Sequence, residues 1–393
     1  MRTILNNGII ITPIRIIKNG GIIIEKNSIV NLFDQSNDIK FGKSDQIIDV
    51  KGHYISPGFI DIHTHGGFGY DYLDGSVESI IKASEGHMRY GVTSIVPTIS
   101  SAPLEKIMNV LDCFKEAKLK NLNGPNLLGV HLEGPYFSFE EKGAQDPNVI
   151  RKPVKEEYMK ILKHSNDILR WSIAPEIEGA LELGRILTKR GILCSAGHTN
   201  AFYDDMLEAY ENGFTHITHL YSSTSMVRRI NAFRYSGVVE SAYLIDEITV
   251  EIIADGKHLP TSLLKLIYKI KGPDKICLIT DSIRAAGLPE GEYIRPDGHK
   301  FIVEDGVAKL KDRTSFAGSI ATANKLLQTM MNYTGISLQD SIKMFTLTPA
   351  RIMKINQYKG LLAPGKDADI VVFDGDLNIK LVMVKGNIRF YSN

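Results

Sequence analysis

Residues 55–65 have the sequence ISPGFIDIHTH, an apolar run that ends in two histidines. The apolar and β-branched residues predict a buried strand over Ile55–His63. The next segment, Ser76–Tyr90, has the length of a helix and begins at a serine, a residue favoured at helix starts. A strand followed by a helix, repeated along a chain, is typical of parallel strands joined by crossover helices.

This unit recurs often enough to predict an α/β protein built on a (β/α)8 barrel of the TIM type. The eight predicted strands are Ile55–His63, Thr93–Thr98, Leu127–Glu133, Trp171–Pro175, Ile192–His198, Thr215–Leu220, Thr249–Asp255 and Ile276–Asp281. The clearest predicted helices between them are Ser76–Tyr90, Leu104–Lys118, Ile177–Arg190 and Ala201–Asn212.

Both ends of the chain predict short strands separated by turns. Asn-Gly and Gly-Gly pairs punctuate residues 1–55, and β-rich runs return at Ala368–Phe373 and Ile379–Val384. We expect the two ends to form one small β-sandwich domain. The predicted domains are therefore residues 1–55 and 356–393 for the small domain and 56–355 for the metal-dependent hydrolase barrel.

The composition is that of an ordinary globular protein of 393 residues, with 43% hydrophobic and 23% charged residues. Lys and Arg number 46 against 45 Asp and Glu, so neither nucleic acid nor a membrane surface is an expected partner. Three cysteines without a CxxC pair favour a reducing compartment, and the N-terminal residues lack the apolar core of a signal peptide. These features predict a cytoplasmic protein.

Polar residues with metal-binding groups end several of the predicted strands. The carboxyl ends of barrel strands meet at one rim, where active sites are built. His63 and His65 lie two positions apart and so share a face of their strand. Imidazole and carboxylate groups are ligands of catalytic divalent ions. The predicted metal ligands are His63, His65, Glu133, His198 and His219.

Each ligand also has a structural interpretation. The two histidines of the first strand can bond backbone at a strand end, and Glu133 can cap the next helix or pair with Lys142. His216 lies three positions before His219, so we expect it to be packed or to face a helix rather than the rim.

Asp281 ends the last predicted strand and is the candidate general base and acid. A carboxylate at this rim can take a proton from the attacking water and return it to the leaving amine. A further metal ligand is the alternative role for Asp281, and the two roles are compatible.

Seven segments in order resemble N-acetylglucosamine-6-phosphate deacetylases of the amidohydrolase superfamily. The segments are Pro57–Gly66, His131–Pro135, Ala196–Thr199, Thr218–Tyr221, Ala254–His258, Thr280–Ser282 and Ala317–Ser319. The segment Gly360–Asp369 resembles the return of that superfamily into its split β domain. The resemblance implies hydrolysis of the acetamide of N-acetylglucosamine 6-phosphate, which releases acetate and glucosamine 6-phosphate.

The resemblance also assigns roles to residues of this chain. It implies that Glu133, His198 and His219 hold the main metal ion, that His63 and His65 add a second ion bridged by Glu133, and that Asp281 transfers protons. The substrate-binding positions that it implies are Ala144, Gln145, Ser222, Ser223, Arg234, His258, Phe316, Ala317 and Gly318.

This chain departs from the family in the segment Ser222–Arg234, which is longer than usual. Arg234 matches the phosphate-binding arginine of the family, and Arg228 and Arg229 are additional phosphate candidates because guanidinium groups suit phosphate. A solvated basic loop is the alternative for these arginines. Family members can donate this loop across a dimer interface, so a homodimer is expected.

Two other functions stay open. The longer loop also suits another N-acetyl amino-sugar phosphate, such as N-acetylgalactosamine 6-phosphate, and a barrel of this kind can be a catalytically inactive binding protein. The fourth strand ends without a lysine, which excludes the carboxylated lysine bridge of dihydroorotase-like enzymes and leaves Glu133 as the bridge. The ligand set accepts Zn, Fe, Mn or Co, as one or two ions per subunit.

Overall fold

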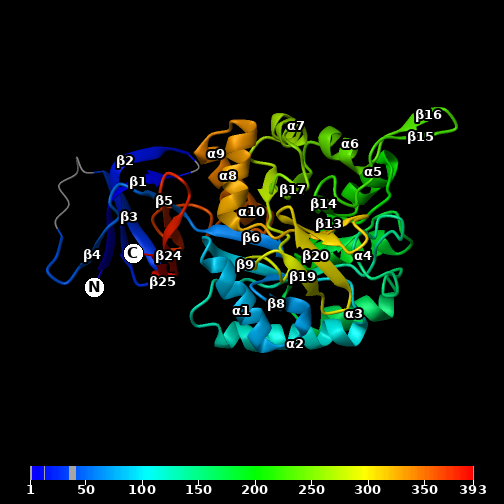
Figure 1. Cartoon of the computed structure of the whole chain (residues 1–393), viewed down its shortest axis with the longest axis horizontal. Helices are drawn as coiled ribbons and strands as arrows, with labels where there is room; N and C mark the ends of the chain where they lie inside the picture. Colours follow the sequence, from blue (N-terminus) through cyan, green and yellow to red (C-terminus); the bar gives the residue numbers. More distant parts are fainter. Residues whose placement is uncertain (1, 13, 35–40, 393) are drawn as a thin grey trace.

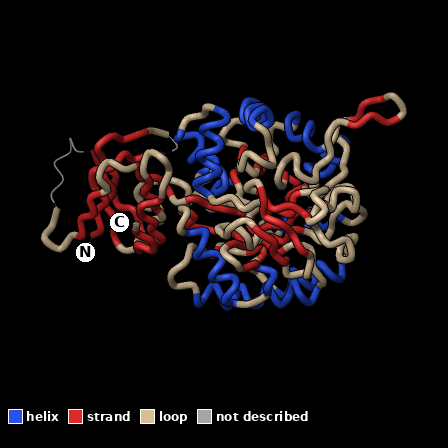
Figure 2. The backbone as a smooth tube through the Cα atoms, in the orientation of Figure 1, coloured by secondary structure: helices blue, strands red, loops and turns tan. Residues whose placement is uncertain are grey.

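The computed structural model describes residues 2–12, 14–34 and 41–392. The predicted small-domain segments 1–55 and 356–393 include a few residues outside this description. Figure 1 shows a barrel surrounded by helices, with a β-sheet from both chain ends packed beside it. The strands from both ends of the chain lie in that sheet, while the helices surround the central strands on the other side of the molecule (Figure 2).

Eight parallel strands form the barrel, as predicted, and each pairs with the next in chain order. They are β6 (Phe59–Thr64), β9 (Val92–Ile99), β11 (Val130–Glu133), β12 (Ile168–Ile173), β13 (Leu193–Ala196), β14 (Phe214–Ile217), β17 (Thr249–Ile252) and β18 (Ile276–Leu278). Beyond the last strand, the backbone N–H of Asp281 donates to the carbonyl of His63 at 2.9 Å. This hydrogen bond brings the eighth strand end against the first.

Helices follow the strands and cover the outside of the barrel (Figure 1). They are α1 (Val77–Met88), α2 (Leu104–Lys120), α3 (Lys155–His164), α4 (Ala180–Lys189), α5 (Tyr203–Glu211), α6 (Val238–Leu244), α7 (Thr261–Lys271), α8 (Ala323–Thr334), α9 (Leu338–Met344) and α10 (Leu347–Ile352). The side chain of Ser76 accepts the backbone N–H of Ser79 at 3.0 Å and caps α1, which explains where this helix begins.

Two of the predicted strands are each divided in the structure. The stretch predicted as Ile55–His63 is β5 (Tyr54–Pro57) in the terminal sheet and then β6 in the barrel. Gly58 joins them, and a Cβ there would lie 2.0 Å from the hydroxyl of Thr93. Only glycine therefore allows this close passage between sheet and barrel. The stretch predicted as Leu127–Glu133 is likewise divided into β10 (Asn126–Leu127) and β11.

The two chain ends form one hydrogen-bonded sheet. Its strands are β1 (Arg2–Ile11), β2 (Ile16–Glu25), β3 (Ser28–Asp34), β4 (Gln46–Asp49), β5, β23 (Ile370–Phe373), β24 (Ile379–Val384) and β25 (Asn387–Tyr391). Strands β5 and β23 pair antiparallel, so the N-terminal and C-terminal parts meet at the centre of the sheet. Apolar side chains from both ends, including Ile22, Ile55 and Val372, pack in a shared core.

Insertions after β18, after β14 and after β6 extend the barrel on the side of the strand ends. A four-stranded sheet follows β18 and consists of β19 (Gly291–Ile294), β20 (Lys300–Glu304), β21 (Val307–Leu310) and β22 (Phe316–Gly318). A hairpin of β15 (Arg228–Ile230) and β16 (Phe233–Tyr235) projects from the body and is called the arm below (Figure 1). The small hairpin β7 (Gly66–Gly67) and β8 (Tyr70–Asp71), with η1 (Tyr72–Asp74), follows β6. None of the described helices is long and apolar enough to cross a bilayer.

Candidate active site

The predicted metal-binding side chains converge at the carboxyl ends of the barrel strands. His63 is the last residue but one of β6, His65 lies just beyond that strand, and Glu133 is the last residue of β11. His198 and His219 follow β13 and β14. All five are buried, although they come from four different strands of the barrel.

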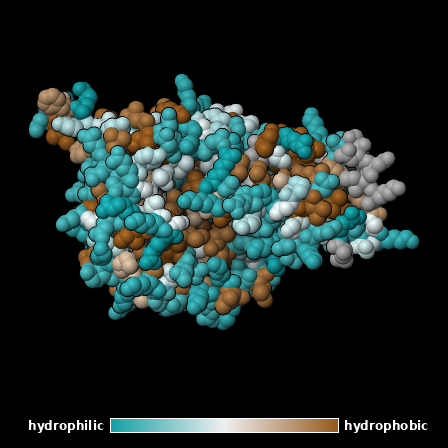
Figure 3. Space-filling view, turned by 180° about the vertical axis from the view of Figure 1, so that it is seen from behind, coloured by the Kyte–Doolittle hydropathy of each residue, from teal (hydrophilic) through white to brown (hydrophobic). Residues whose placement is uncertain are grey.

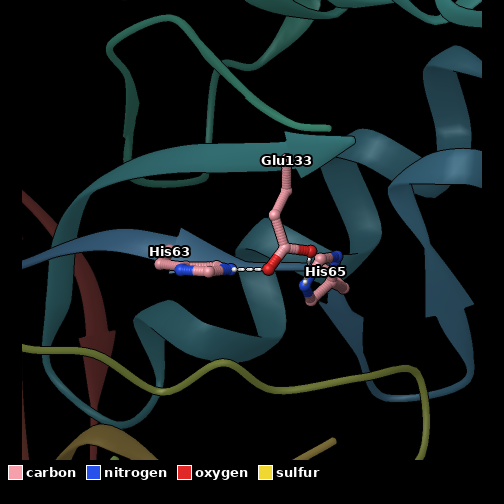
Figure 4. Close-up of side chains that lie close together, drawn as sticks. All are labelled: His63, His65 and Glu133. Carbon is pink, nitrogen blue, oxygen red and sulfur yellow. Dashed lines mark ion pairs between the residues drawn. The ribbon is translucent and has the colours of Figure 1, made fainter. Parts of the chain in front are cut away.

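The carboxylate of Glu133 lies at the centre of this group. Its Oε1 is 3.0 Å from Nε2 of His219 and 3.2 Å from Nε2 of His198. On the other side, Nε2 of His63 lies 3.5 Å from Oε1 and Nε2 of His65 lies 3.4 Å from Oε2. Figure 4 shows the rings of His63 and His65 pointing at the two oxygens of Glu133. Two ligand clusters thus share one carboxylate, as a bridged pair of ions requires.

Each histidine directs Nε2 inward because its Nδ1 has a partner on the outer side. Nδ1 of His65 lies 2.9 Å from the hydroxyl of Ser100. Nδ1 of His219 lies 3.1 Å from the carbonyl oxygen of Ser222. In His198 the partner is the carbonyl of Glu141, at 2.9 Å. Such outer partners fix the tautomer and ring orientation of metal-binding histidines. In His63 the inward Nε2 is a buried atom without a hydrogen-bond partner, which fits a lone pair kept for an ion.

Asp281 faces the same cluster from the end of the last barrel strand. Its Oδ1 lies 3.3 Å from Nε2 of His63 and 3.2 Å from Nε2 of His65. Burial raises the pKa of the Asp281 carboxyl, but the charges of His63 and His65 outweigh burial and hold that pKa below its usual value. Glu133 behaves alike: burial opposes ionisation, yet the hydrogen bonds of His198 and His219 hold its pKa well below the usual value.

Left-handed backbone conformations concentrate at these strand ends. The φ angles of His198, His219 and Asp281 are 47°, 25° and 45°. Such angles are uncommon for residues other than glycine, and strained backbone often occurs where side chains must be aimed at a ligand. Each strand therefore turns sharply at the residue that it presents to the cluster.

A cavity of about 290 Å³ opens over the cluster, near the lower end of the range for small-molecule pockets. It is lined by every predicted substrate-binding residue except Arg234, namely Ala144, Gln145, Ser222, Ser223, His258, Phe316, Ala317 and Gly318. Gln145 donates its side-chain amide to Oε2 of Glu133 at 2.6 Å. His258 pairs with Asp255 at 2.7 Å and packs against the ring of Phe316. The predicted sugar-binding positions therefore surround the predicted metal ligands.

The three predicted phosphate-binding arginines lie on the arm and do not line this cavity. Arg228 donates to the backbone carbonyl of Asn200 at 2.8 Å and lies 4.0 Å above the ring of Phe202. Arg229 and Arg234 face each other across the two strands of the arm and are exposed. Their role in phosphate binding stays a prediction.

Sequence reasoning missed two other arginines at the cavity, Arg284 and Arg295. Arg295 donates to the carbonyl of Ala144 at 2.6 Å and pairs with Asp297 at 3.2 Å. Both arginines belong to the insertion after β18. The apolar run Phe301–Val303 and the Asp-Gly turn at 305–306 indicate a hairpin in the sequence. Nothing in the sequence indicates that this hairpin folds back over the cavity.

Sequence reasoning also missed a charged pair inside the barrel, Arg170 of β12 and Glu251 of β17. Both side chains are fully buried and bond directly to each other. The signal was present, because a charge within an apolar strand needs a buried partner. His216 lies beside them, with Nε2 3.5 Å from Glu251, so it is packed inside the barrel, which was one of the two alternatives predicted for it.

Comparison with known proteins gives consistent matches over the whole chain. A model of the amidohydrolase family matches residues 54–389. An N-acetylglucosamine-6-phosphate deacetylase of Bacillus subtilis is 34% identical over 387 residues, which cover 98% of this chain and 96% of that protein. An N-acetylgalactosamine-6-phosphate deacetylase of Escherichia coli is 30% identical over 338 residues, which cover 86% and 88% of the two chains.

Among solved structures, a mutant N-acetylglucosamine-6-phosphate deacetylase of Mycobacterium smegmatis is similar at a TM-score of 0.90. It is 27% identical and covers 99% of both chains. That structure is a complex with N-acetylglucosamine 6-phosphate.

Proposed function

This chain belongs to the amidohydrolase family and is a deacetylase of that family, and we propose that its substrate is N-acetylglucosamine 6-phosphate. The products are glucosamine 6-phosphate and acetate. The observation that carries the proposal is the position of Asp281, within 3.3 Å of two imidazoles at the edge of a Glu133-centred cluster. A general acid and base and a metal-binding set thus face the same cavity.

The residues that would hold the metal are Glu133, His198 and His219 on one side and His63 and His65 on the other. Neutral imidazoles and one carboxylate fit Zn, Fe, Mn or Co, and the shared carboxylate has room for one or two ions. A divalent ion in such a site lowers the pKa of water and polarises a carbonyl oxygen.

Asp281 supplies the proton transfers in this proposal. Its carboxylate lies within 3.3 Å of two of the metal-binding imidazoles and faces the cavity, so it can accept the proton of the attacking water. The same group then donates that proton to the amine nitrogen as the amide C–N bond breaks. This order leaves the carboxylate ionised for the next turnover.

The cavity residues orient the sugar. Ser222, Ser223 and the backbone of Phe316–Gly318 offer hydroxyl and peptide groups, and His258 is fixed by Asp255. The phosphate requires cationic groups, and guanidinium groups bind phosphate in a bidentate manner. We assign this role to Arg234, with Arg228 and Arg229 as further candidates.

The arm supports a homodimer in which Arg234 reaches the cavity of a second copy. In Figure 3 the arm projects from the body at the upper left and bears hydrophobic side chains. Met226, Val227, Ile230, Phe233 and Tyr235 are exposed large apolar residues on this segment. An exposed apolar group of this kind is typical of a protein interface.

The galactosamine epimer is the second candidate substrate. The Escherichia coli relative is an N-acetylgalactosamine-6-phosphate deacetylase, and it matches this chain almost as well as the glucosamine enzymes do. The longer segment Ser222–Arg234 borders the cavity, so it can change which epimer fits.

Acetate release tests the proposal. The purified enzyme is given N-acetylglucosamine 6-phosphate, N-acetylgalactosamine 6-phosphate and the two unphosphorylated sugars, and its metal content is measured in parallel. We expect the highest kcat/KM on N-acetylglucosamine 6-phosphate. A preference for the galactosamine compound would select the second candidate, and no acetate from any of the four would refute the function.

Metal removal tests the mechanism. A chelator should remove the ions together with the activity, and Zn²⁺, Mn²⁺ or Co²⁺ should restore it. A metal-free enzyme that keeps full activity would contradict the mechanism.

The prediction of a cytoplasmic location rests on the cysteines. Cys113, Cys194 and Cys277 are all free, as expected in a reducing compartment. Cell fractionation tests this prediction, and recovery of the enzyme outside the cytoplasm would contradict it.

A further inference from the structure

The base of the arm rests on the segment 199–203, which follows strand β13 at the rim and is called the platform below. Backbone groups of the platform bond to the chain before and after the arm. The N–H of Thr199 donates to the carbonyl of Ser223 at 3.1 Å, and the N–H of Tyr203 donates to the carbonyl of Ser236 at 3.0 Å. The chain therefore enters and leaves the arm over the same short segment.

Arg228, the first residue of the arm, binds the platform through its side chain. Its Nη1 donates to the side-chain oxygen of Asn200, and its Nη2 donates to the backbone carbonyl of the same residue at 2.8 Å. The guanidinium also lies 4.0 Å above the ring of Phe202, a position in which a cation is attracted to the ring. That ring contacts the ring of Tyr235, the cross-strand partner of Arg228, at 5.6 Å between centroids. Both strands of the arm are thus tied to the platform at their base.

Glu176, three residues after β12, fixes the part of the platform that Arg228 binds. Its Oε1 accepts the backbone N–H of Asn200 at 2.6 Å, and its Oε2 accepts the hydroxyl of Thr199 at 2.5 Å. Asn200 is therefore held by Glu176 through its N–H and by Arg228 through its two oxygens. A continuous series of hydrogen bonds joins the rim of the barrel to the base of the arm.

The three arginines of the arm differ in what their guanidinium groups contact. Arg229 and Arg234 are exposed, whereas Arg228 has a buried Nε and both Nη groups bonded within its own chain. Fixing a binding group in its bound position before the ligand arrives lowers the entropic cost of binding. We infer that Arg228 is a positioning residue, which sets the direction of the arm and thereby the place at which Arg234 meets the phosphate of the substrate.

Arg228→Lys separates this role from direct phosphate binding. Lysine keeps the positive charge but lacks the planar fork and the flat face of the guanidinium, so it cannot reproduce the contacts with Asn200 and Phe202. We expect KM for the phosphorylated substrate to rise about 10-fold at unchanged kcat, because a misplacement of about 1 Å can cost up to about 100-fold. A KM equal to that of wild type would show that the charge alone is sufficient and would overturn the inference.

Phe202→Leu changes the platform instead of the arm. Leucine is apolar, has no aromatic face and cannot bind phosphate, so any change in KM comes from the position of Arg228. We expect KM for the phosphorylated substrate to rise about twofold to fivefold at unchanged kcat, as the loss of one cation–π contact would produce. An unchanged KM, or a loss in kcat alone, would overturn the inference.

Arg190→Lys is the matched control. Arg190 also donates a guanidinium N–H to a backbone carbonyl, that of Leu162 at 2.9 Å, but it lies at the end of α4, near the start of β13 and away from the rim. We expect KM and kcat of this variant to equal those of wild type. A KM as high as that of Arg228→Lys would show a general effect of losing such a contact and would overturn the inference.

The inference rests on the proposed function, because it takes Arg234 as the phosphate ligand, and hydrogen exchange of the free enzyme lets the two fail separately. The N–H groups of Thr199 and Tyr203, which join the platform to the arm, should exchange faster in Arg228→Lys than in wild type or Arg190→Lys. Faster exchange in a protein that releases no acetate would refute the proposed function and leave Arg228 as the residue that holds the arm. Unchanged exchange in an active deacetylase would refute the inference and leave the function.

Discussion

The rim of the barrel and the arm are built in opposite ways. At the rim, side chains from distant parts of the sequence meet around Glu133 at 3.0 to 3.5 Å and are buried. On the arm, residues adjacent in sequence form a two-stranded hairpin that projects into solvent (Figure 1). The barrel strands fix the position of every rim group. The arm, in contrast, is joined to the body at its base and projects away from it.

The difference separates the two tasks of the proposed enzyme. The groups that perform the chemistry are held completely by one chain. The groups assigned to the phosphate, Arg234 above all, lie outside the cavity of that chain. Chemistry and phosphate recognition can therefore be disturbed one at a time, and the predictions below follow this division.

Asp281→Asn is expected to have the largest effect. The asparagine cannot accept a proton, so kcat should fall about 100-fold to 10,000-fold while the bound metal stays in place. Acetate release under saturating substrate and metal analysis of the same sample measure both effects. Asp297→Asn is a control, since Asp297 lines the same cavity on the inserted sheet, and it should lower kcat less. Retained turnover in Asp281→Asn would remove Asp281 from its role.

The rim could be predicted from the sequence because its signal is local. Each apolar strand ends in a polar residue, and the barrel rule brings strand ends together without any knowledge of contacts. In the structure one cluster contains His63, His65, Glu133, His198 and His219. The barrel rule alone is enough to predict that they lie together. The strand count is correct for the same reason.

The parts that could not be predicted depend on contacts between distant residues. The division of the first strand at Gly58 follows from its approach to Thr93. The pairing of Arg170 with Glu251 joins β12 to β17, and the placement of Arg295 depends on how the inserted sheet folds back. Hydrophobic periodicity describes each segment separately and contains none of this information.

Asp71, near the rim, should make the unfolding free energy of the protein depend on pH. Burial raises the pKa of Asp71 from 3.8 to about 6. The folded state therefore favours the protonated form of Asp71. The stability that goes with this form is fully present below about pH 4 and is lost as the pH rises through 6. A shift of about two pKa units corresponds to at most about 3 kcal/mol.

Asp71→Asn removes this titration. Compared with wild type, the metal-free variant should gain unfolding free energy as the pH rises from 4 to 7, by about 3 kcal/mol at most. Urea unfolding at several pH values measures the difference. A constant difference across this range would contradict the assignment.

Arg234→Ala tests the arm directly. Charged hydrogen bonds contribute about 1.5–3 kcal/mol, so KM for the phosphorylated substrate should rise about 10-fold or more while kcat changes little. Arg229→Ala, at the cross-strand partner of Arg234, is the matched control and should have a smaller effect. An equal loss on the unphosphorylated sugar would refute the phosphate assignment.

Mixed dimers show whether the arm acts on its own chain or on the partner. Asp281→Asn and Arg234→Ala chains are each impaired, but a mixed dimer contains one cavity with Asp281 from one chain and Arg234 from the other. Activity should rise on mixing if the arm reaches across. Strictly additive activities would place Arg234 in its own chain's site.

Phe233→Ser should have the smallest effect on folding. The ring is 70% exposed, so its loss should change the unfolding free energy of the monomer by about 0.5 kcal/mol or less. The buried ring of Phe59, at the end of β6 opposite the rim, should cost about 3–5 kcal/mol when changed to alanine. If the arm forms a dimer, Phe233→Ser should instead lower the molar mass in solution and raise KM for the phosphorylated sugar, because both effects come from one interface. Light scattering and kinetics on the same sample test this link, and a monomer with unchanged KM would show that phosphate recognition lies within one chain.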